Sequence, residues 1–471
     1  MSDQNTIKNP WGPFRIILIG VFALMLMLSM NTPAYPLITA ELNIDPSYVA
    51  WMSVAYSLGA AVLAPMMGRL SDLIGLKRIL VLGLVLSTVG PLLVGGGLNL
   101  PMILVGRLIQ GLGTASMIPA CTAFAGRFFP PAEAPKAYSV FGAVSTGACI
   151  FGPTIAGLVC ANFGWRPIYL GGAVLLGIST ILVAITMPSI AVLSQKSTRF
   201  DFVGSITLFI SLGSILTLST VVDQFGATHP SSLILMALFV ICMILFLITE
   251  TRVEAPLIRL SMFKNRGFTV PALLFLIFSG FTTVFMYMSS YYISGGLRLS
   301  SAITGYWAMV QFLVSTLFAI VVNKLLAKMN WQKIALIPIV IMSIACAMYG
   351  MFRGTDVSML LLFLGACLIG AASAFNTPLY TASALREVSD DVRGVASGTF
   401  RLIGDLGAPI FVAIFVPMLS SIGRTADGHP DFAVSFPKVC LILLIPCLIA
   451  LILFFFYPKH DPKQDKKEAA K

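Results

Sequence analysis

The chain has 471 residues, of which 58% are hydrophobic and only 10% are charged, and its formal net charge is +11. A soluble domain carries about 25% charged residues, so this chain has too few of them to cover the surface of a water-soluble globule of this length. The apolar residues also occur in runs of about 20, the length that crosses a hydrocarbon core of about 30 Å. Backbone polar groups cannot stay unpaired in lipid, so we expect an all-α integral membrane protein.

Fourteen such runs follow one another along the chain, and each predicts a transmembrane helix. The first is too long for the apolar core of a signal peptide and is expected to remain as an uncleaved span. The fourteen spans are expected near residues 14–36, 47–69, 78–97, 101–126, 137–160, 166–187, 202–222, 231–249, 268–293, 303–323, 332–352, 357–380, 394–418 and 434–457.

Basic residues divide unevenly between the two ends of these spans. If both termini are cytoplasmic, 23 of the 30 lysines and arginines lie on the cytoplasmic side, five lie outside, and Arg107 and Arg401 lie within spans. Because positive residues set membrane orientation, we expect both termini to be cytoplasmic. The net positive charge then follows from topology and does not indicate a nucleic-acid partner. No N-x-[ST] sequon occurs, which favours a bacterial inner (plasma) membrane.

Cysteine and histidine give no sign of a metal site. The eight cysteines occur singly within apolar runs, and the three histidines fall in loops or in the C-terminal tail. This pattern is typical of small buried apolar cysteines rather than of disulfides or metal ligands. We therefore expect neither a metal nor another cofactor.

The segment that follows the second span carries the first recognisable motif. It reads G-R-L-S-D-L-I-G-L-K-R, with Gly68, Asp72, Gly75, Lys77 and Arg78 at the positions that matter. It resembles the signature loop of the major facilitator superfamily, G-x-x-x-D-x-x-G-R-[KR]-[KR]. The two glycines suit a tight turn and close helix approach. The resemblance implies a conformational gate; the alternative is a solvated charged loop.

Two further spans extend the resemblance. The fourth span reads R-L-I-Q-G-L-G-T-A from Arg107, similar to the family element R-x-x-Q-G-x-G-x-A. An arginine within a span is costly, so it should face a partner or a water-filled cavity, unless it extends to the outer boundary. The fifth span carries Gly152, Pro153 and Gly157 in a pattern similar to the exporter motif G-x-x-x-G-P-x-x-G-G. These three residues are candidates for the gate; the alternative is helix packing alone.

The middle of the chain is similar to the fourteen-span drug:proton antiporter branch of this superfamily. That branch has two six-helix bundles with two helices inserted between them. We therefore expect a six-helix bundle over 1–190, two additional helices and linkers over 191–262, a second bundle over 263–458 and a basic cytoplasmic tail over 459–471. One departure stands in the first span, where the sequence Met30 to Pro36 contains no acidic residue in place of the usual D-x-T-I-V-N element.

A proton-driven carrier needs a group that titrates within the membrane, and charges at that depth are usually functional. Asp405 lies about eleven residues into the thirteenth span, and Arg401 lies one turn earlier, so the two side chains can meet. We expect Asp405, Arg401 and Arg107 to take part in proton coupling. The alternative is a permanent ion pair that only neutralises Arg401. Other acids, such as Glu41 at the outer end of the first span, are expected to be solvated.

The resemblance also implies a substrate cavity lined mainly by the first, fourth, ninth and twelfth spans. Transporter sites lie near the membrane midplane. Asn31 and Arg107 should lie at a similar depth and can face each other. For each aromatic side chain alone, core packing or the lipid interface is the competing interpretation. The substrate-binding candidates are Asn31, Tyr35, Gln110, Tyr287, Tyr291, Trp307, Gln311, Asn376 and Tyr380.

These features predict a proton-coupled exporter of amphiphilic small molecules, including drugs, that works as a monomer by alternating access. The alternative keeps the fold but transports one metabolite, peptide or lipid, because fold does not fix substrate. A channel would not need the signature loop. An intramembrane enzyme acting on phosphorylated lipids should show paired acids, and only Asp390 and Asp391 are adjacent. We therefore expect no enzyme activity; substrate, protons and membrane lipid are the expected partners.

Overall fold

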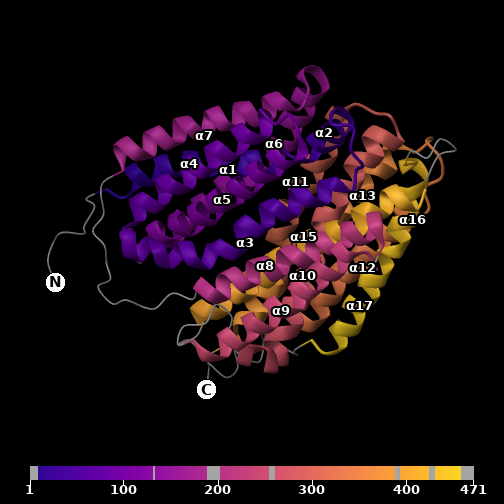
Figure 1. The fold of residues 1–471 in the computed structure, drawn as a ribbon. Coiled ribbons are helices and arrows are strands. Elements are labelled where there is room, and N and C mark those ends of the chain that lie inside the picture. Colours follow the sequence, from indigo (N-terminus) through magenta and orange to yellow (C-terminus); the bar gives the residue numbers. More distant parts are fainter. Residues whose placement is uncertain are drawn as a thin grey trace. The chain divides into compact units, whose positions relative to one another are not determined.

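The computed structural model describes residues 9–130, 133–187, 202–226, 228–253, 260–386, 388, 393–423 and 430–457. Helices make up nearly all of these residues, and no β-strand occurs among them (Figure 1). The predicted all-helical architecture is confirmed.

The predicted count of fourteen spans is supported only in part. Within the described residues, twelve helical segments are long and apolar enough to cross a membrane. Two more helices, α3 (Tyr48–Ile74) and α8 (Phe202–Phe225), have 27 and 24 residues, but several of their side chains lie outside the described set. Twelve spans are therefore supported among the described residues, and the predicted fourteen are not confirmed.

The chain divides into two compact units. The first comprises Met1–Ile44, Trp51–Thr217 and Leu233–Ala255, and the second comprises Asp45–Ala50, Leu218–Ser232 and Pro256–Lys471. The expected bundle boundaries at residues 190 and 262 stay a prediction.

Within the described part of the chain, ten helical segments precede residue 255. They are α1 (Trp11–Ser29), η1 (Thr32–Ala34), α2 (Tyr35–Glu41), α3, α4 (Leu76–Gly95), α5 (Leu100–Phe128), α6 (Ala134–Phe163), α7 (Arg166–Thr186), α8 and α9 (Pro230–Arg252). The later segments are η2 (Leu260–Lys264), α10 (Arg266–Tyr291), η3 (Tyr292–Gly296), α11 (Ser301–Leu326), α12 (Trp331–Gly350), α13 (Met359–Ser373), η4 (Asn376–Thr381), α14 (Ala382–Arg386), α15 (Arg393–Ser421), α16 (Phe432–Ile442) and α17 (Leu444–Phe455). Each predicted span coincides with one of these helices or with a consecutive set of them.

The largest difference from the predicted boundaries concerns the signature segment. Helix α3 continues to Ile74 and α4 begins at Leu76, so the connection is Gly75 alone. Gly75 has φ = 99°, a conformation that side chains disfavour, which explains why the turn needs glycine. Gly68 lies inside α3 rather than in this turn, and its role in close helix approach and gating stays a prediction.

Glycines bring the helices of the first unit into close contact. A Cβ on Gly111 of α5 would overlap the backbone of α3 at Tyr56, and one on Gly106 would lie 2.8 Å from the carbonyl oxygen of Gly90 in α4. Helices α1, α4, α5, α6 and α7 accordingly lie side by side (Figure 1). Small residues allow this approach because lipid supplies no hydrophobic force between helices.

Glycines also allow close helix packing in the second unit. A Cβ on Gly407 of α15 would overlap the backbone carbonyl of Leu276 in α10, so these two helices pack at van der Waals distance. Gly370 of α13 likewise packs on the backbone of Gln311 in α11. The position of Gln311 is therefore fixed by backbone packing.

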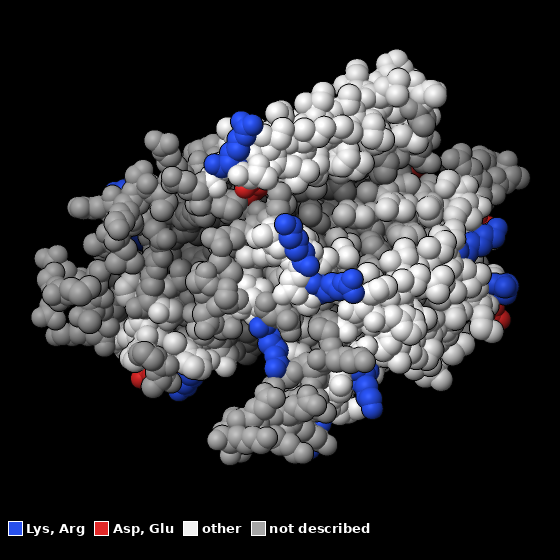
Figure 2. All heavy atoms as spheres, turned by 90° about the horizontal axis from the view of Figure 1, so that it is seen from below, with Lys and Arg blue, Asp and Glu red and all other residues white. Residues whose placement is uncertain are grey.

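Large apolar side chains are exposed along whole helices. Helix α9 exposes Leu233, Ile234, Ile241 and Ile244, each by more than half of its surface. On the face drawn in Figure 2, the few lysines and arginines, in blue, lie among uncharged residues drawn in white. Such a surface is suited to lipid contact and explains the low charge content.

Two of the spans are interrupted at the same short sequence. The segment Asn31-Thr32-Pro33-Ala34-Tyr35 contains the 3₁₀ turn η1, which lies between α1 and α2. Asn376-Thr377-Pro378-Leu379-Tyr380 forms most of the π-helical segment η4 between α13 and α14. Proline removes a backbone donor and perturbs the hydrogen-bond ladder, and π segments inside helices are frequent at functional sites. This repeated N-T-P-x-Y segment provides one asparagine and one tyrosine to each unit.

Candidate functional site

Arg107 of α5 lies at the centre of a polar cluster in the first unit, and only 2% of its surface is exposed. Its guanidinium donates to Asn31 Oδ1 at 3.1 Å and to Gln110 Oε1 at 2.8 Å. It also donates to the hydroxyl of Tyr35 at 3.4 Å, and it lies 5.0 Å from the centre of the Tyr56 ring. The expected contact between Asn31 and Arg107 is thus observed, and Arg107 is buried rather than extended toward the outer boundary.

Asn31 is oriented by bonds on both sides of its amide. Its Nδ2 donates to the carbonyl oxygen of Leu28 at 2.8 Å, while its Oδ1 accepts from Tyr169 of α7 at 2.8 Å as well as from Arg107. The interruption of the span at η1 places Asn31 where it can reach both helices. The polar atoms of Asn31 are therefore committed to bonds within the protein.

The second unit contains a cavity of about 350 Å³, which lies within the range of small-molecule sites. Its wall mixes hydroxyl groups, two amides, two aromatic rings and an ion pair. The lining residues are Phe275, Ser279, Thr282, Thr283, Gln311, Phe312, Ser315, Ser373, Asn376, Thr377, Arg401 and Asp405.

Two side chains on this wall have polar atoms without hydrogen-bond partners among the described residues. Gln311 is 1% exposed, and neither its Oε1 nor its Nε2 is bonded. The Oδ1 atom of Asn376 is also buried and unbonded. Leaving a buried polar group unbonded costs about 1–3 kcal/mol, so the arrangement is retained at a cost to stability. An ordered water or an ion can supply the missing partner of such an atom.

Arg401 and Asp405 lie on the same wall, one turn apart on α15. The Arg401 Nε atom lies 2.9 Å from Asp405 Oδ2, so the predicted meeting of the two side chains is observed. The side chains are 67% and 40% exposed, which means that this pair faces the cavity rather than a closed core.

The aromatic candidates of the second unit lie outside the wall of the cavity. Trp307 is fully buried and its Nε1 donates to the Tyr349 hydroxyl at 3.0 Å, so its polar atom serves packing within the unit. Tyr287 and Tyr291 are also buried, and Tyr291 packs against Phe432. Tyr380 packs between Phe278 and Tyr457, and its buried hydroxyl is unbonded within the described residues. Their roles in substrate binding stay a prediction.

The proposed gate residues divide between two places. Gly75 forms the turn between α3 and α4, with Lys77 and Arg78 in the first turn of α4; the side chain of Asp72 lies outside the described set. Gly152, Pro153 and Gly157 are buried in α6. Helix α6 packs on α1, where the Ser29 hydroxyl donates to the Ala148 carbonyl at 3.3 Å. Close packing of α6 is thus observed, and a gating role stays a prediction.

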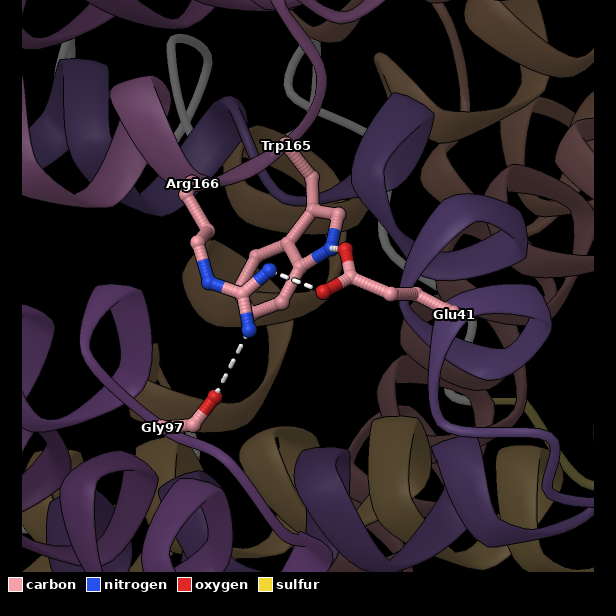
Figure 3. Close-up of polar contacts among 4 residues, drawn as sticks. All are labelled: Glu41, Gly97, Trp165 and Arg166. Carbon is pink, nitrogen blue, oxygen red and sulfur yellow. Dashed lines mark hydrogen bonds and ion pairs between the residues drawn. The ribbon is translucent and has the colours of Figure 1, made fainter.

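Glu41 joins three parts of the first unit, as Figure 3 shows. Its carboxylate forms an ion pair with Arg166 and accepts from Trp165 Nε1 at 2.6 Å. Arg166 also donates to the carbonyl oxygen of Gly97 at 3.1 Å. These bonds connect the end of α2 to the start of α7 and to the connection between α4 and α5. The Glu41 side chain is 45% exposed, as expected of a solvated charge, and its bonds to Trp165 and Arg166 are an addition that the sequence did not predict.

Sequence reasoning missed most of the cavity wall. Four residues of the wall belong to no motif: Phe275, Thr282, Ser315 and Ser373. Serine and threonine inside spans usually bond to their own helix, so their presence there does not indicate a binding site. The repeated N-T-P-x-Y segment is the sequence signal that relates Asn376 and Tyr380 to Asn31 and Tyr35.

Comparison with known proteins identifies the class. Similar proteins include the riboflavin transporter RibZ of Clostridioides difficile, 26% identical over 97% of this chain and 99% of RibZ. Multidrug resistance protein 3 of Bacillus subtilis is 23% identical over 88% of this chain and 80% of its own. The crystal structure of the nucleoside transporter NupG has the same fold, with a TM-score of 0.70 and 13% identity, and the match covers 94% of this chain and 100% of NupG.

The fold and these relatives define a multi-pass membrane transporter rather than an enzyme. The family model described as Major Facilitator Superfamily matches residues 17–412, and the chain belongs to that superfamily.

Proposed function

We propose that this protein is a proton-coupled exporter of amphiphilic small molecules in a bacterial plasma membrane, with both termini cytoplasmic. The Arg401–Asp405 pair carries this proposal, because it places an ionisable carboxylate on the wall of a cavity of substrate size. The similarity to Multidrug resistance protein 3 supports the export of varied compounds. The unbroken lengths of α3 and α8 support fourteen spans.

In this scheme Asp405 takes a proton from the outer side and gives it up on the inner side. Protonation removes the carboxylate charge that holds Arg401, so the guanidinium can move between Asp405 and the substrate. Entry of one proton down a potential of 100 mV releases about 2.3 kcal/mol, which drives the alternation of access. The buried guanidinium of Arg107 would hold the polar cluster of the first unit in register during this cycle.

A second candidate function is the transport of one metabolite. The match to RibZ supports it, since it covers nearly the whole of both chains. Resistance of overexpressing cells to several unrelated toxic compounds favours the exporter, whereas uptake or efflux of riboflavin alone favours the dedicated carrier.

Proton flux in proteoliposomes tests the coupling. A pH-sensitive dye inside the vesicles should respond when amphiphilic compounds are added to the wild type, and the response should fall to background in Asp405→Asn. Asp356→Asn is the matched control, because Asp356 is an exposed carboxylate in the connection between α12 and α13. Wild-type flux in the Asp405→Asn protein would rule out the assigned role of Asp405.

A further inference from the structure

Three exposed lysines lie around the connection between α11 and α12. Lys324 belongs to the last turn of α11, Lys328 to the connection itself and Lys333 to the first turn of α12. No aspartate or glutamate occurs between Ser301 and Gly350, the stretch that comprises both helices and their connection. This end of the helix pair therefore carries a concentrated positive charge that no acidic residue of the same stretch balances.

Two apolar side chains accompany these lysines. Met329 is 40% exposed in the connection. Trp331 begins α12, and its Nε1 donates to the carbonyl oxygen of Leu326, the last residue of α11, at 2.9 Å. Tryptophan and lysine at the end of a span are typical of the boundary between the hydrocarbon core and the lipid headgroups. We therefore expect this boundary to pass through the connection.

One face of α11 leads directly to this basic end. Residues three or four positions apart share a helix face, and Lys324 shares its face with four exposed apolar residues. These residues form the apolar stripe and are Leu313, Leu317, Ile320 and Val321. Gln311 and Ser315, which line the cavity, each stand two positions before a member of the stripe and so lie about 200° away around the helix. The apolar stripe therefore faces away from the cavity.

The apolar stripe has the length of one lipid leaflet. At about 1.5 Å per residue, the distance along the helix axis from Leu313 to Lys324 is about 16 Å. Half of a hydrocarbon core of about 30 Å is nearly the same length. An acyl chain that lies along the stripe therefore places its headgroup at the level of Lys324 and Lys328.

We propose that the apolar stripe and the three lysines form a binding site for an anionic phospholipid, with an acyl chain along α11 and the phosphate beside Lys324 and Lys328. Phosphatidylcholine brings its own ammonium group to the lysines, which opposes its binding. A soluble phosphate ion gains nothing from the apolar stripe. A basic residue near anionic headgroups strengthens binding about fivefold. The site is independent of the compounds that the protein transports.

Lipid binding to the purified wild-type protein provides the first test. Native mass spectrometry of the protein in detergent should give an apparent affinity for dioleoylphosphatidylglycerol at least about fivefold higher than for dioleoylphosphatidylcholine, the effect of one lysine beside an anionic headgroup. The two lipids have the same acyl chains, so the difference reports the headgroup. Equal affinities would overturn the proposal.

Two lysine variants locate the preference. Lys324→Gln should weaken the binding of the phosphatidylglycerol about fivefold and leave that of the phosphatidylcholine unchanged. Lys438→Gln is the matched control, because it removes the same charge from an exposed position of α16, and it should keep the wild-type preference. Because both side chains are exposed, neither change removes a buried contact. A full preference in Lys324→Gln, or an equal loss in Lys438→Gln, would place the preference elsewhere and overturn the site.

Soluble phosphate and a short-chain lipid test the role of the apolar stripe. Millimolar inorganic phosphate should not displace the dioleoyl lipid, and dihexanoylphosphatidylglycerol should bind at least about tenfold more weakly, because it covers only part of the stripe. Displacement by phosphate, or equal binding of the two chain lengths, would indicate a site for a free anion and overturn the lipid site. None of these measurements involves transport, so their failure leaves the proposed exporter untouched.

Discussion

The two N-T-P-x-Y segments have nearly the same sequence but different surroundings. In the first unit, Asn31 and Tyr35 both accept hydrogen bonds from a single buried guanidinium, that of Arg107. In the second unit, the Asn376 Oδ1 and the Tyr380 hydroxyl have no bond among the described residues. The same helix interruption therefore carries polar groups that are bonded within the fold in one unit and unbonded among the described residues in the other. Polar cores give stability when fully bonded and reduce it when partly bonded.

The largest expected effect comes from two variants that test whether both units depend equally on close helix packing. In Gly111→Ala and in Gly407→Ala the new methyl group overlaps the backbone of a neighbouring helix. We expect each variant to lose about 3 kcal/mol of its free energy of unfolding. Thermal unfolding in detergent measures this loss. Gly147→Ala and Gly398→Ala are matched controls, because nothing lies within 4 Å of the added atom. A loss in only one unit would show that the packing is not equivalent.

The next effect concerns the guanidinium in the first unit. Arg107→Met leaves Gln110 Oε1 without its donor and removes a bond from Asn31, so we expect a loss of about 2 kcal/mol. The melting temperature should fall clearly, whereas Arg15→Met, at an exposed position of α1, should leave it nearly unchanged. An unchanged melting temperature in Arg107→Met would mean that the cluster contributes little to the fold.

The smallest effect gives the sharpest contrast, because its sign should differ between units. Gln110→Met removes the unbonded Nε2 but also loses the bond from the charged Arg107, which is the larger effect, and it should destabilise the protein by about 1 kcal/mol. Gln311→Met removes a buried amide that has no bond among the described residues and should stabilise the protein by up to about 1 kcal/mol. Unfolding of the two variants under identical conditions measures both. Destabilisation of the same size in both variants would contradict the difference between the bonded Gln110 and the unbonded Gln311.

Hydropathy predicted the positions of the helices because a span needs length and apolar content, both of which are visible in sequence. The contact between Asn31 and Arg107 was predictable as well, since counting residues from the outer ends of two spans gives their depth. The interruption at Asn376 was not, because proline in a span is compatible with a kink, a 3₁₀ turn or a π segment.

The side chains that the aromatic candidates contact could not be predicted from the sequence either. Trp307 donates to Tyr349, which lies 42 residues later on another helix, and only the packing of α11 and α12 decides that contact. Likewise, nothing in the sequence distinguishes the bonded amide of Asn31 from the unbonded Oδ1 of Asn376, because the difference lies in Arg107, on a separate helix.

Helix α2 is short, and its last residue is bonded to the start of α7. Its seven residues extend about 10 Å, from the 3₁₀ turn at Pro33 to Glu41, whose carboxylate is bound to Trp165 and Arg166. Through Glu41, the end of α2 is bound to the start of α7, and Pro33, just beyond the other end of α2, lies two residues from Asn31. The ends of these helices are thus linked by a short, continuous path to the segment that carries one buried amide.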